Sequence, residues 1–180
     1  MNKNILIIST SPRKGGNSEI LADEFMKGAI AAGNKAKKIS LYNKIINFCK
    51  GCLTCQSTGK CFIKDDANNI VEEMLHADVL VFATPIYFYE MCGQMKTLLD
   101  RTNPLFSSDY AFRDIYLLTS AADNAKNSMD GAIKGLQGWI DCFEKTSLKG
   151  VIKGLGVTNS GDIENIPTLM KSAYDMGHDI

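Results

Sequence analysis

Short apolar runs alternate with amphipathic segments along the chain, and this alternation is the feature that most limits its fold. The runs at residues 4–9 and 79–83 are apolar at almost every position, which is typical of strands buried on both faces of a parallel sheet. Further strands are predicted at residues 38–41, 115–119 and 148–157. Because a segment with helical spacing of apolar residues follows each run, the pattern predicts an α/β fold with helices on both faces of the sheet.

The number of predicted elements narrows the fold further. Helices are expected over residues 18–32, 65–76, 94–102, 126–144 and 166–176. Five parallel strands favour a flavodoxin-like three-layer sandwich with strand order 2-1-3-4-5 over the six-stranded dinucleotide-binding fold. The 180 residues contain no obvious linker, repeat or low-complexity segment, so residues 1–180 are expected to form one domain.

Charge and hydropathy exclude some functional classes. The chain has 20 Lys and Arg against 20 Asp and Glu, a formal net charge of zero, which predicts no binding to nucleic acid or to an anionic membrane surface. A membrane-spanning helix needs about 20 apolar residues, and the apolar runs here are far shorter. The N-terminus also lacks the apolar core of a signal peptide, so the chain is expected in the cytoplasm, where thiols stay reduced.

The loop after the first predicted strand, residues 9–18, favours a phosphate ligand. It offers four serine and threonine hydroxyls among Ser9, Thr10, Ser11 and Ser18, together with two glycines, two cations and the start of a helix. It contains neither a Walker motif nor the Gly-x-Gly-x-x-Gly turn, so a terminal phosphate monoester fits better than a buried pyrophosphate. The alternative is a polar turn in which Asn17 or Ser18 caps the helix.

Two further loops are expected at the same edge of the sheet. Residues 84–93 contain three aromatic side chains that can pack against a flat ring, although they could instead fill the core or a subunit interface. Residues 119–124 are small and let a ligand approach the backbone, although a plain helix-capping loop would look the same. Ligands of open parallel sheets bind beyond the carboxyl ends of the strands, where these loops meet.

Four cysteines lie close together in the spacing C-x2-C-x2-C-x5-C: Cys49, Cys52, Cys55 and Cys61. Four thiolates at such spacing can hold a [4Fe–4S] cluster. Zinc, a redox disulfide and reduced free thiols remain open alternatives. Cys92 and Cys142 lie elsewhere and are expected to be ordinary buried thiols.

Several stretches together resemble one known family. They are residues 9–18, 49–55, 59–66, 83–87 and 95–101, and the resemblance covers roughly residues 4–120. The family comprises the NADPH-dependent FMN reductases and their relatives, the iron–sulfur flavoproteins. The resemblance implies a flavodoxin-like fold, bound FMN, reduction by NADH or NADPH, and a dimer or tetramer with the flavin near the subunit boundary.

The resemblance also implies residue roles. Residues of the first loop would hold the FMN phosphate: Ser9, Ser11, Pro12, Arg13, Asn17 and Ser18. Residues after the third strand would lie along the isoalloxazine ring: Pro85, Ile86, Tyr87 and Phe88. Ser120 and Ala121 would approach the ring from the other side, and the four cysteines would bind the metal. Thr10 departs from the usual glycine, and Ala121 and Ala122 stand in a loop that is often rich in glycine.

The sequence therefore predicts an FMN-dependent oxidoreductase that accepts hydride from NAD(P)H and passes electrons to a small-molecule or protein acceptor, through a [4Fe–4S] cluster if the cysteines hold one. The flavin would carry the chemistry, in keeping with the absence of a catalytic histidine or carboxylate pair. A homodimer or homotetramer is expected, because residues 87–89 cannot all contact one ring. The alternatives are a non-enzymatic electron carrier like flavodoxin, which the zero net charge disfavours, and a zinc-stabilised binding module without flavin.

Overall fold

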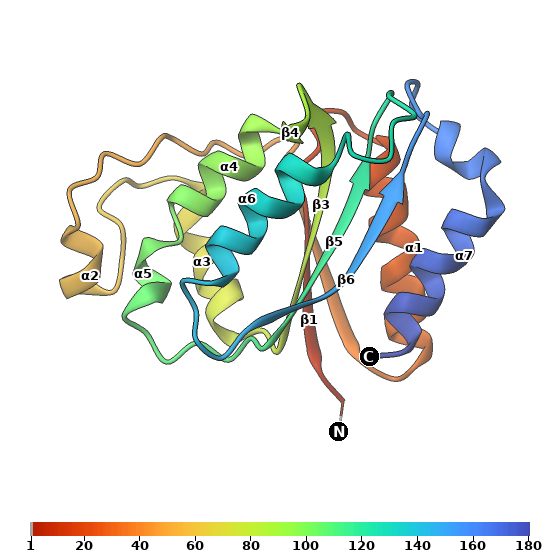
Figure 1. The fold of residues 1–180 in the computed structure, drawn as a ribbon. Helices are drawn as coiled ribbons and strands as arrows, with labels where there is room; N and C mark the ends of the chain where they lie inside the picture. The colour runs from red at the N-terminus through yellow and green to blue at the C-terminus, as the bar shows by residue number, and fades with distance from the viewer. Residues whose placement is uncertain (1) are drawn as a thin grey trace.

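A sheet of five parallel strands forms the centre of the protein in the computed structural model, which describes residues 2–180 (Figure 1). The strands pair in the order β2-β1-β3-β5-β6. They are β1 (Asn4–Ser9), β2 (Lys35–Ser40), β3 (Val79–Tyr87), β5 (Asp114–Ser120) and β6 (Ser147–Gly154). Counted along the chain as parallel strands one to five, this is the predicted order 2-1-3-4-5, so the flavodoxin-like α/β fold class is confirmed.

A short sixth strand, β4 (Glu90–Met91), was not predicted. It pairs antiparallel with the end of β3, joining Ile86 to Met91 and Tyr87 to Glu90. The prediction that a loop begins at residue 84 was therefore wrong. β3 continues to Tyr87 because its last residues find backbone partners, first in β5 and then in β4.

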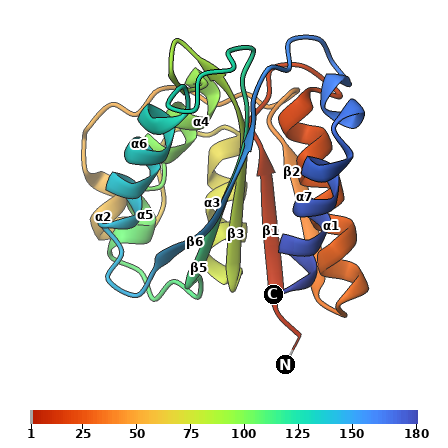
Figure 2. The ribbon, with the colours of Figure 1, turned by 45° about the vertical axis from the view of Figure 1, so that its right-hand side comes forward.

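Helices cover both faces of the sheet, as Figures 1 and 2 show from two directions. One face carries α3, α4, α5 and α6, with α2 at its margin, and the other carries α1 and α7. The helices are α1 (Asn17–Ala31), α2 (Thr54–Thr58), α3 (Asp66–His76), α4 (Gly93–Asp100), α5 (Asn103–Phe106), α6 (Asp130–Ile140), the 3-10 helix η1 (Asp162–Asn165) and α7 (Pro167–His178). The helix predicted over residues 126–144 is shorter, because hydrogen-bonded turns occupy both of its ends.

The side chains of the strands alternate between the two faces of the sheet, so the strands contribute to two separate hydrophobic cores. On β1, Leu6 and Ile8 enter the core beneath α3, α4 and α6, whereas Ile5 and Ile7 enter the core beneath α1 and α7. All four side chains are at most 3% exposed. Burial on both faces explains why the strand reads as one continuous apolar run.

Helices α1 and α7 approach each other closely at two glycines. A Cβ atom at Gly28 of α1 would lie 2.0 Å from the carbonyl oxygen of Tyr174, and one at Gly177 of α7 would lie 2.1 Å from the carbonyl oxygen of Phe25. No side chain fits at either position without moving a helix backbone. This contact holds α1 against α7. The first turn of α1 belongs to the site at the carboxyl ends of the strands.

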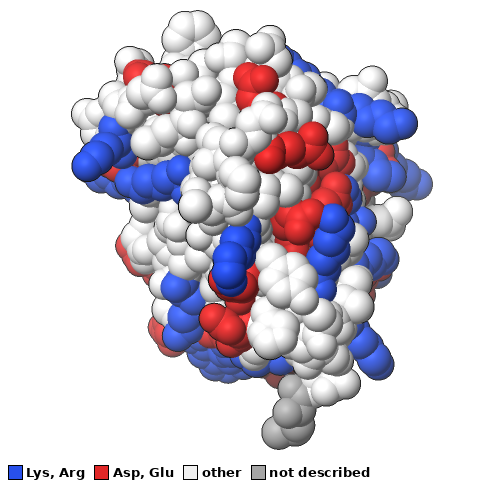
Figure 3. Space-filling model, turned by 90° about the vertical axis from the view of Figure 1, so that its right-hand side faces the viewer, with Lys and Arg blue, Asp and Glu red and all other residues white. Residues whose placement is uncertain are grey.

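The outer surface of this helical layer carries charges of both signs, and Figure 3 shows acidic and basic side chains close together on it. Several of these charges are paired, among them Lys171 of α7, whose ammonium lies 2.5 Å from the Asp175 carboxylate. Over residues 2–180, no helix is both long enough and apolar enough to cross a membrane.

Candidate functional site

Four loops meet around one cavity at the carboxyl ends of the strands, at the top of Figure 1. This cavity, the site cavity, has a volume of about 150 Å³. Its lining comes from the ends of β3 and β5, the loops after β1, β5 and β6, and the first turn of α1: Ser11, Arg13, Gly16, Asn17, Ser18, Pro85, Ile86, Tyr87, Ser120, Ala122, Val157, Thr158 and Ser160. The strand order places these loops together, because β1 and β3 are neighbours where the order of strands reverses.

The loop after β1 folds around the Ser11 hydroxyl. The Ser11 Oγ atom donates to the Arg13 carbonyl at 2.9 Å and accepts from the Arg13 amide at 3.1 Å. A Cβ atom at Gly16 would lie only 2.6 Å from this Oγ atom, so glycine lets the backbone turn closely past Ser11. The exposed Arg13 guanidinium reaches across the cavity and donates to the Thr158 carbonyl at 3.2 Å.

The first turn of α1 leaves donors without protein partners. Gly16 is its N-cap and makes no side-chain capping bond, so the alternative that Asn17 or Ser18 caps the helix is wrong. The Ser9 and Ser18 hydroxyls are at most 1% exposed and have no hydrogen-bond partner in the described chain. Buried hydroxyls are normally satisfied, and the positive end of a helix favours an anion. Ser18, which lines the site cavity, and the start of α1 therefore fit a phosphate group.

Asn17 has a different local role in this structure. Its Nδ2 atom donates to the Asn159 carbonyl at 2.8 Å, and its Oδ1 atom accepts from the Ile163 amide at 3.2 Å. The side chain therefore ties the start of α1 to the loop after β6, while still lining the site cavity.

The opposite wall is formed by Pro85, Ile86 and Tyr87 at the end of β3. Beyond them the chain turns through Phe88 and Tyr89, whose φ angles of 51° and 65° lie in the left-handed region. Such two-residue hairpin turns favour asparagine and glycine, and left-handed backbone costs other residues about 1–2 kcal/mol each. The Phe88 side chain is 100% exposed and lies outside the cavity lining.

The predicted residues are thus mostly brought together. Eight of the twelve residues predicted to bind the cofactor line the site cavity, whereas Ser9, Pro12, Phe88 and Ala121 do not. Ala122 lines it in place of Ala121, whose amide and carbonyl bond to Gly154 and Val157. The sequence reasoning missed the loop after β6, which contributes three lining residues. This loop could have been identified from its position after the fifth predicted strand, which places it at the same edge of the sheet as the other loops.

The four clustered cysteines lie away from the site cavity, in the segment between β2 and α3 that passes outside α5 (Figure 1). Cys49 and Cys52 are exposed, Cys61 is half-buried, and Cys55 is buried with its sulfur 3.4 Å from the Asn103 Nδ2 atom. No group of three or more metal-ligating side chains forms within residues 2–180. The cysteines as arranged therefore do not fit a [4Fe–4S] cluster or a four-thiolate zinc site.

The cysteine thiols differ in chemical environment. The hydroxyl of Thr54, followed by its amide, lowers the pKa of the Cys52 thiol by hydrogen bonding to the sulfur. Outside the clustered motif, Cys92 is buried as expected, whereas Cys142 is exposed at the end of α6, which corrects the prediction of a buried thiol there.

A buried ion pair links the two ends of the segment that contains the clustered cysteines. Arg101 donates to both carboxylate oxygens of Asp65, at 2.7 and 3.0 Å, and to the carbonyls of Asn47 and Ile63. The side chains of Arg101 and Asp65 are 0% and 2% exposed. Burial raises the pKa of the Asp65 carboxyl, but hydrogen bonds from Arg101, Asn47 and Ala67 outweigh this and lower the pKa from 3.8 to about 2.

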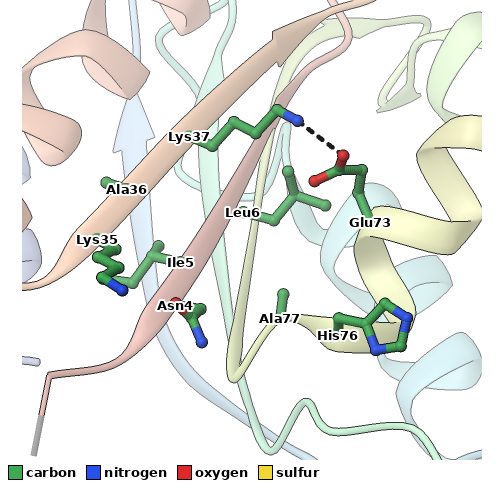
Figure 4. Close-up of a pocket in the computed structure, with 9 residues that line it drawn as sticks. All are labelled: Asn4, Ile5, Leu6, Lys35, Ala36, Lys37, Glu73, His76 and Ala77. Atoms are coloured by element: carbon green, nitrogen blue, oxygen red, sulfur yellow. Dashed lines mark hydrogen bonds and ion pairs between the residues drawn. The ribbon is translucent and has the colours of Figure 1, made fainter.

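Another cavity, of about 320 Å³, lies at the opposite end of the sheet between the start of β1, the start of β2 and the end of α3 (Figure 4). The Lys37 ammonium crosses its rim to the Glu73 carboxylate at 2.7 Å. Both side chains are exposed, by 59% and 43%, and the buried, unpartnered polar side-chain atoms of the described chain belong to other residues. No ligand is assigned to this cavity.

Comparison with known proteins shows which family the chain resembles. The profile of the NADPH-dependent FMN reductase family matches residues 3–136. An iron–sulfur flavoprotein of Methanocaldococcus jannaschii is 39% identical over 101 residues, which are 56% of this chain and 52% of the relative. YwqN of Bacillus subtilis, named provisionally as an NAD(P)H-dependent FMN-containing oxidoreductase, is 31% identical over 173 residues and 88% of each chain.

Solved structures share the fold. An NAD(P)H:quinone oxidoreductase from Methanothermobacter marburgensis superposes with a TM-score of 0.79, at 16% identity, over 99% of this chain and 96% of the other. An azoreductase from Bacillus anthracis gives a TM-score of 0.74, also at 16% identity, over the whole of both chains. The match to the M. jannaschii relative spans only about half of that protein's length. The chain belongs to the NADPH-dependent FMN reductase family.

Proposed function

We propose that this protein is an FMN-dependent oxidoreductase that accepts hydride from NAD(P)H and passes the electrons to a small-molecule or protein acceptor. The observation that carries the proposal is the start of α1, where a buried serine hydroxyl without a partner and an uncapped helix end face a cavity that Arg13 also lines. Family membership supports FMN as the ligand of this cavity.

Different residues of the site cavity would bind different parts of FMN. The Ser18 hydroxyl, with the first-turn amides of α1, would donate hydrogen bonds to the FMN phosphate, Ser11 would hold the loop around it through its bonds to Arg13, and the Arg13 guanidinium would add charge. The backbone and side chains of residues 85–87 would lie along the ring and exclude water from one side. Ser120 and Ala122 would border the other side. Bound FMN supplies the hydride-accepting chemistry, and the described cavity holds no histidine or carboxylate that would need to act as acid or base.

A titration of the apoprotein with FMN tests the site. Replacing Arg13 with Ala removes a charge-assisted contact of about 1.5–3 kcal/mol, so the FMN dissociation constant is expected to rise about ten- to a hundredfold. Ser18→Ala should weaken binding in the same direction. Lys14→Ala is the matched control, because Lys14 is an exposed neighbour that does not line the cavity. Unchanged FMN affinity in Arg13→Ala and Ser18→Ala, or a preference for FAD over FMN, would refute this placement.

Steady-state oxidation of NADH and NADPH separates the enzyme from the electron carrier. Turnover with either nucleotide in the presence of a quinone or excess free flavin supports the oxidoreductase. Stable FMN binding without turnover would instead identify a flavodoxin-like carrier.

A separate question is whether the four clustered cysteines hold an iron–sulfur cluster. The C-x2-C-x2-C-x5-C spacing and the names of several relatives support a [4Fe–4S] cluster, but the arrangement of the sulfurs does not. The electron path proposed here therefore leads from the flavin directly to the acceptor. Iron and sulfide analysis after anaerobic purification decides the matter. About four irons per chain, lost in Cys52→Ser while FMN remains bound, would replace this path with one through a cluster.

We also propose that the protein self-associates through the hairpin tip formed by Phe88 and Tyr89. Tyr89 is 61% exposed beside the fully exposed Phe88, and both residues hold strained backbone conformations that nothing within one chain rewards with burial. A second copy would cover these rings. Sedimentation at micromolar concentration should show at least a dimer, and Phe88→Asn combined with Tyr89→Gly should weaken it. A monomeric wild-type protein would refute this proposal.

A further inference from the structure

Cys92 occupies a buried position between two loops of the site cavity. It is the N-cap of α4 and its side chain is 0% exposed. Its sulfur donates to the Thr10 carbonyl oxygen at 3.2 Å, and lies 3.2 Å from the Thr10 hydroxyl and 3.4 Å from the Thr84 hydroxyl. Its amide donates to the same Thr84 hydroxyl at 3.2 Å. One thiol therefore joins the loop after β1, the end of β3 and the start of α4.

Thr10 completes this network. Its hydroxyl and its amide both donate to the Ala83 carbonyl, at 3.0 and 2.8 Å. A glycine, the residue usual here in the resembled family, would keep the amide bond but lose the hydroxyl. The Thr10 carbonyl is left for the Cys92 thiol, so the orientation of the next peptide plane depends on that thiol.

The orientation of this peptide plane also sets the direction of the Ser11 amide. The described chain has no cis peptide bond, so the Ser11 amide points opposite to the Thr10 carbonyl and away from Cys92. Ser11 is 3% exposed and lines the site cavity, and no hydrogen bond among residues 2–180 uses its amide. A buried backbone donor without a partner is rare in folded proteins.

We propose that Cys92 is a positioning residue for the phosphate of the flavin cofactor: its thiol fixes the peptide between Thr10 and Ser11 so that the Ser11 amide donates to that phosphate. The inference rests on the proposed FMN site. Cys92 touches neither the cofactor nor the acceptor, and acts through the carbonyl that it holds.

The test compares FMN with riboflavin, which has the same ring but no phosphate. In Cys92→Ala, the ratio of the riboflavin dissociation constant to the FMN dissociation constant should fall about three- to tenfold, because only the phosphate contact is weakened. Cys92→Ser keeps a donor at this position and should return the ratio to within about threefold of the wild-type value. Cys142→Ala removes an exposed thiol remote from the loop and should leave the ratio unchanged.

Each result of this titration has a distinct meaning. A lower ratio in Cys92→Ala that Cys92→Ser restores supports the proposal. Equal losses of FMN and riboflavin affinity, or no change in either, overturn it, because a general packing defect affects both ligands. If Cys92→Ala does not fold, Thr84→Val removes the hydroxyl that anchors the Cys92 amide and should lower the same ratio. A wild-type protein that binds neither ligand would refute the proposed function itself.

Discussion

Removing the Asp65 carboxylate should destabilise the protein in a way that depends on pH. Arg101 is completely buried, so Asp65→Asn leaves a buried cation without its counter-charge, which costs about 3–5 kcal/mol in comparable cases. The pKa of Asp65 falls from 3.8 to about 2 on folding, which corresponds to about 2.4 kcal/mol of stability at neutral pH.

The sign of the pH dependence is set by the lowered pKa. Stability from this group is fully present above pH 3.8 and disappears as the pH falls through the folded-state value of about 2. About half of it is already lost at pH 3. The difference in unfolding free energy between wild type and Asp65→Asn should therefore shrink by about 1 kcal/mol between pH 7 and pH 3.

Urea unfolding at the two pH values measures this difference. Asp100→Asn is the control, because its carboxylate pairs with Lys96 at the surface, where removal of an ion pair costs less than about 1 kcal/mol. A gap between wild type and Asp65→Asn that stays the same at pH 7 and pH 3 would show that the carboxyl is not held ionised by Arg101. The reasoning from the buried pair would then be wrong.

Three further predictions concern backbone geometry. Gly177→Ala should lower the unfolding free energy by about 1–3 kcal/mol or more, because its Cβ would meet the Phe25 carbonyl oxygen at 2.1 Å. Gly138→Ala in α6, where the added Cβ would meet nothing within 4 Å beyond the backbone of its own helix, should instead raise it by up to about 1 kcal/mol in the same urea titration. Replacing Phe88 with Asn and Tyr89 with Gly should raise the unfolding free energy of the dissociated chain by about 1–2 kcal/mol in total, measured by thermal denaturation at low protein concentration, because the loss of the hydrogen bond from the Tyr89 hydroxyl to Asp123 offsets part of the strain released at the two positions. A lower melting temperature would show that the aromatic tip is not strained.

Local sequence patterns were sufficient to predict much of the fold. The apolar runs located the parallel strands, and their number and alternation with helices gave the correct strand order. α2, α5 and η1 were missed because four or five residues are too few to show helical periodicity. The extension of β3 was missed because it depends on β4, a partner of only two residues.

The site was predictable where it is formed by residues close together in the chain and hidden where it depends on distant contacts. The loop after β1 could be read directly, because its hydroxyls and glycines precede a helix. The pairing of Asp65 with Arg101, 36 residues away, leaves no local signal, and neither does the contact of Cys92 with Thr10 across 82 residues. The spacing of the cysteines left a cluster, zinc, a disulfide and free thiols open, and it could not show that Asn103 would engage Cys55 from α5.

The buried pair at Arg101 has a consequence for how this family can diversify. Because Arg101 donates to the carbonyls of residues 47 and 63 and to Asp65, the two ends of the intervening segment are held together by one buried side chain. Its length and chemistry can therefore change without reopening the core beneath α3 and α4. The residues between 47 and 63 can thus be exchanged while the buried Asp65–Arg101 pair remains in place. Related chains with other residues in this segment can keep the same buried pair, and the site cavity, which no residue between 47 and 63 lines, would keep its shape.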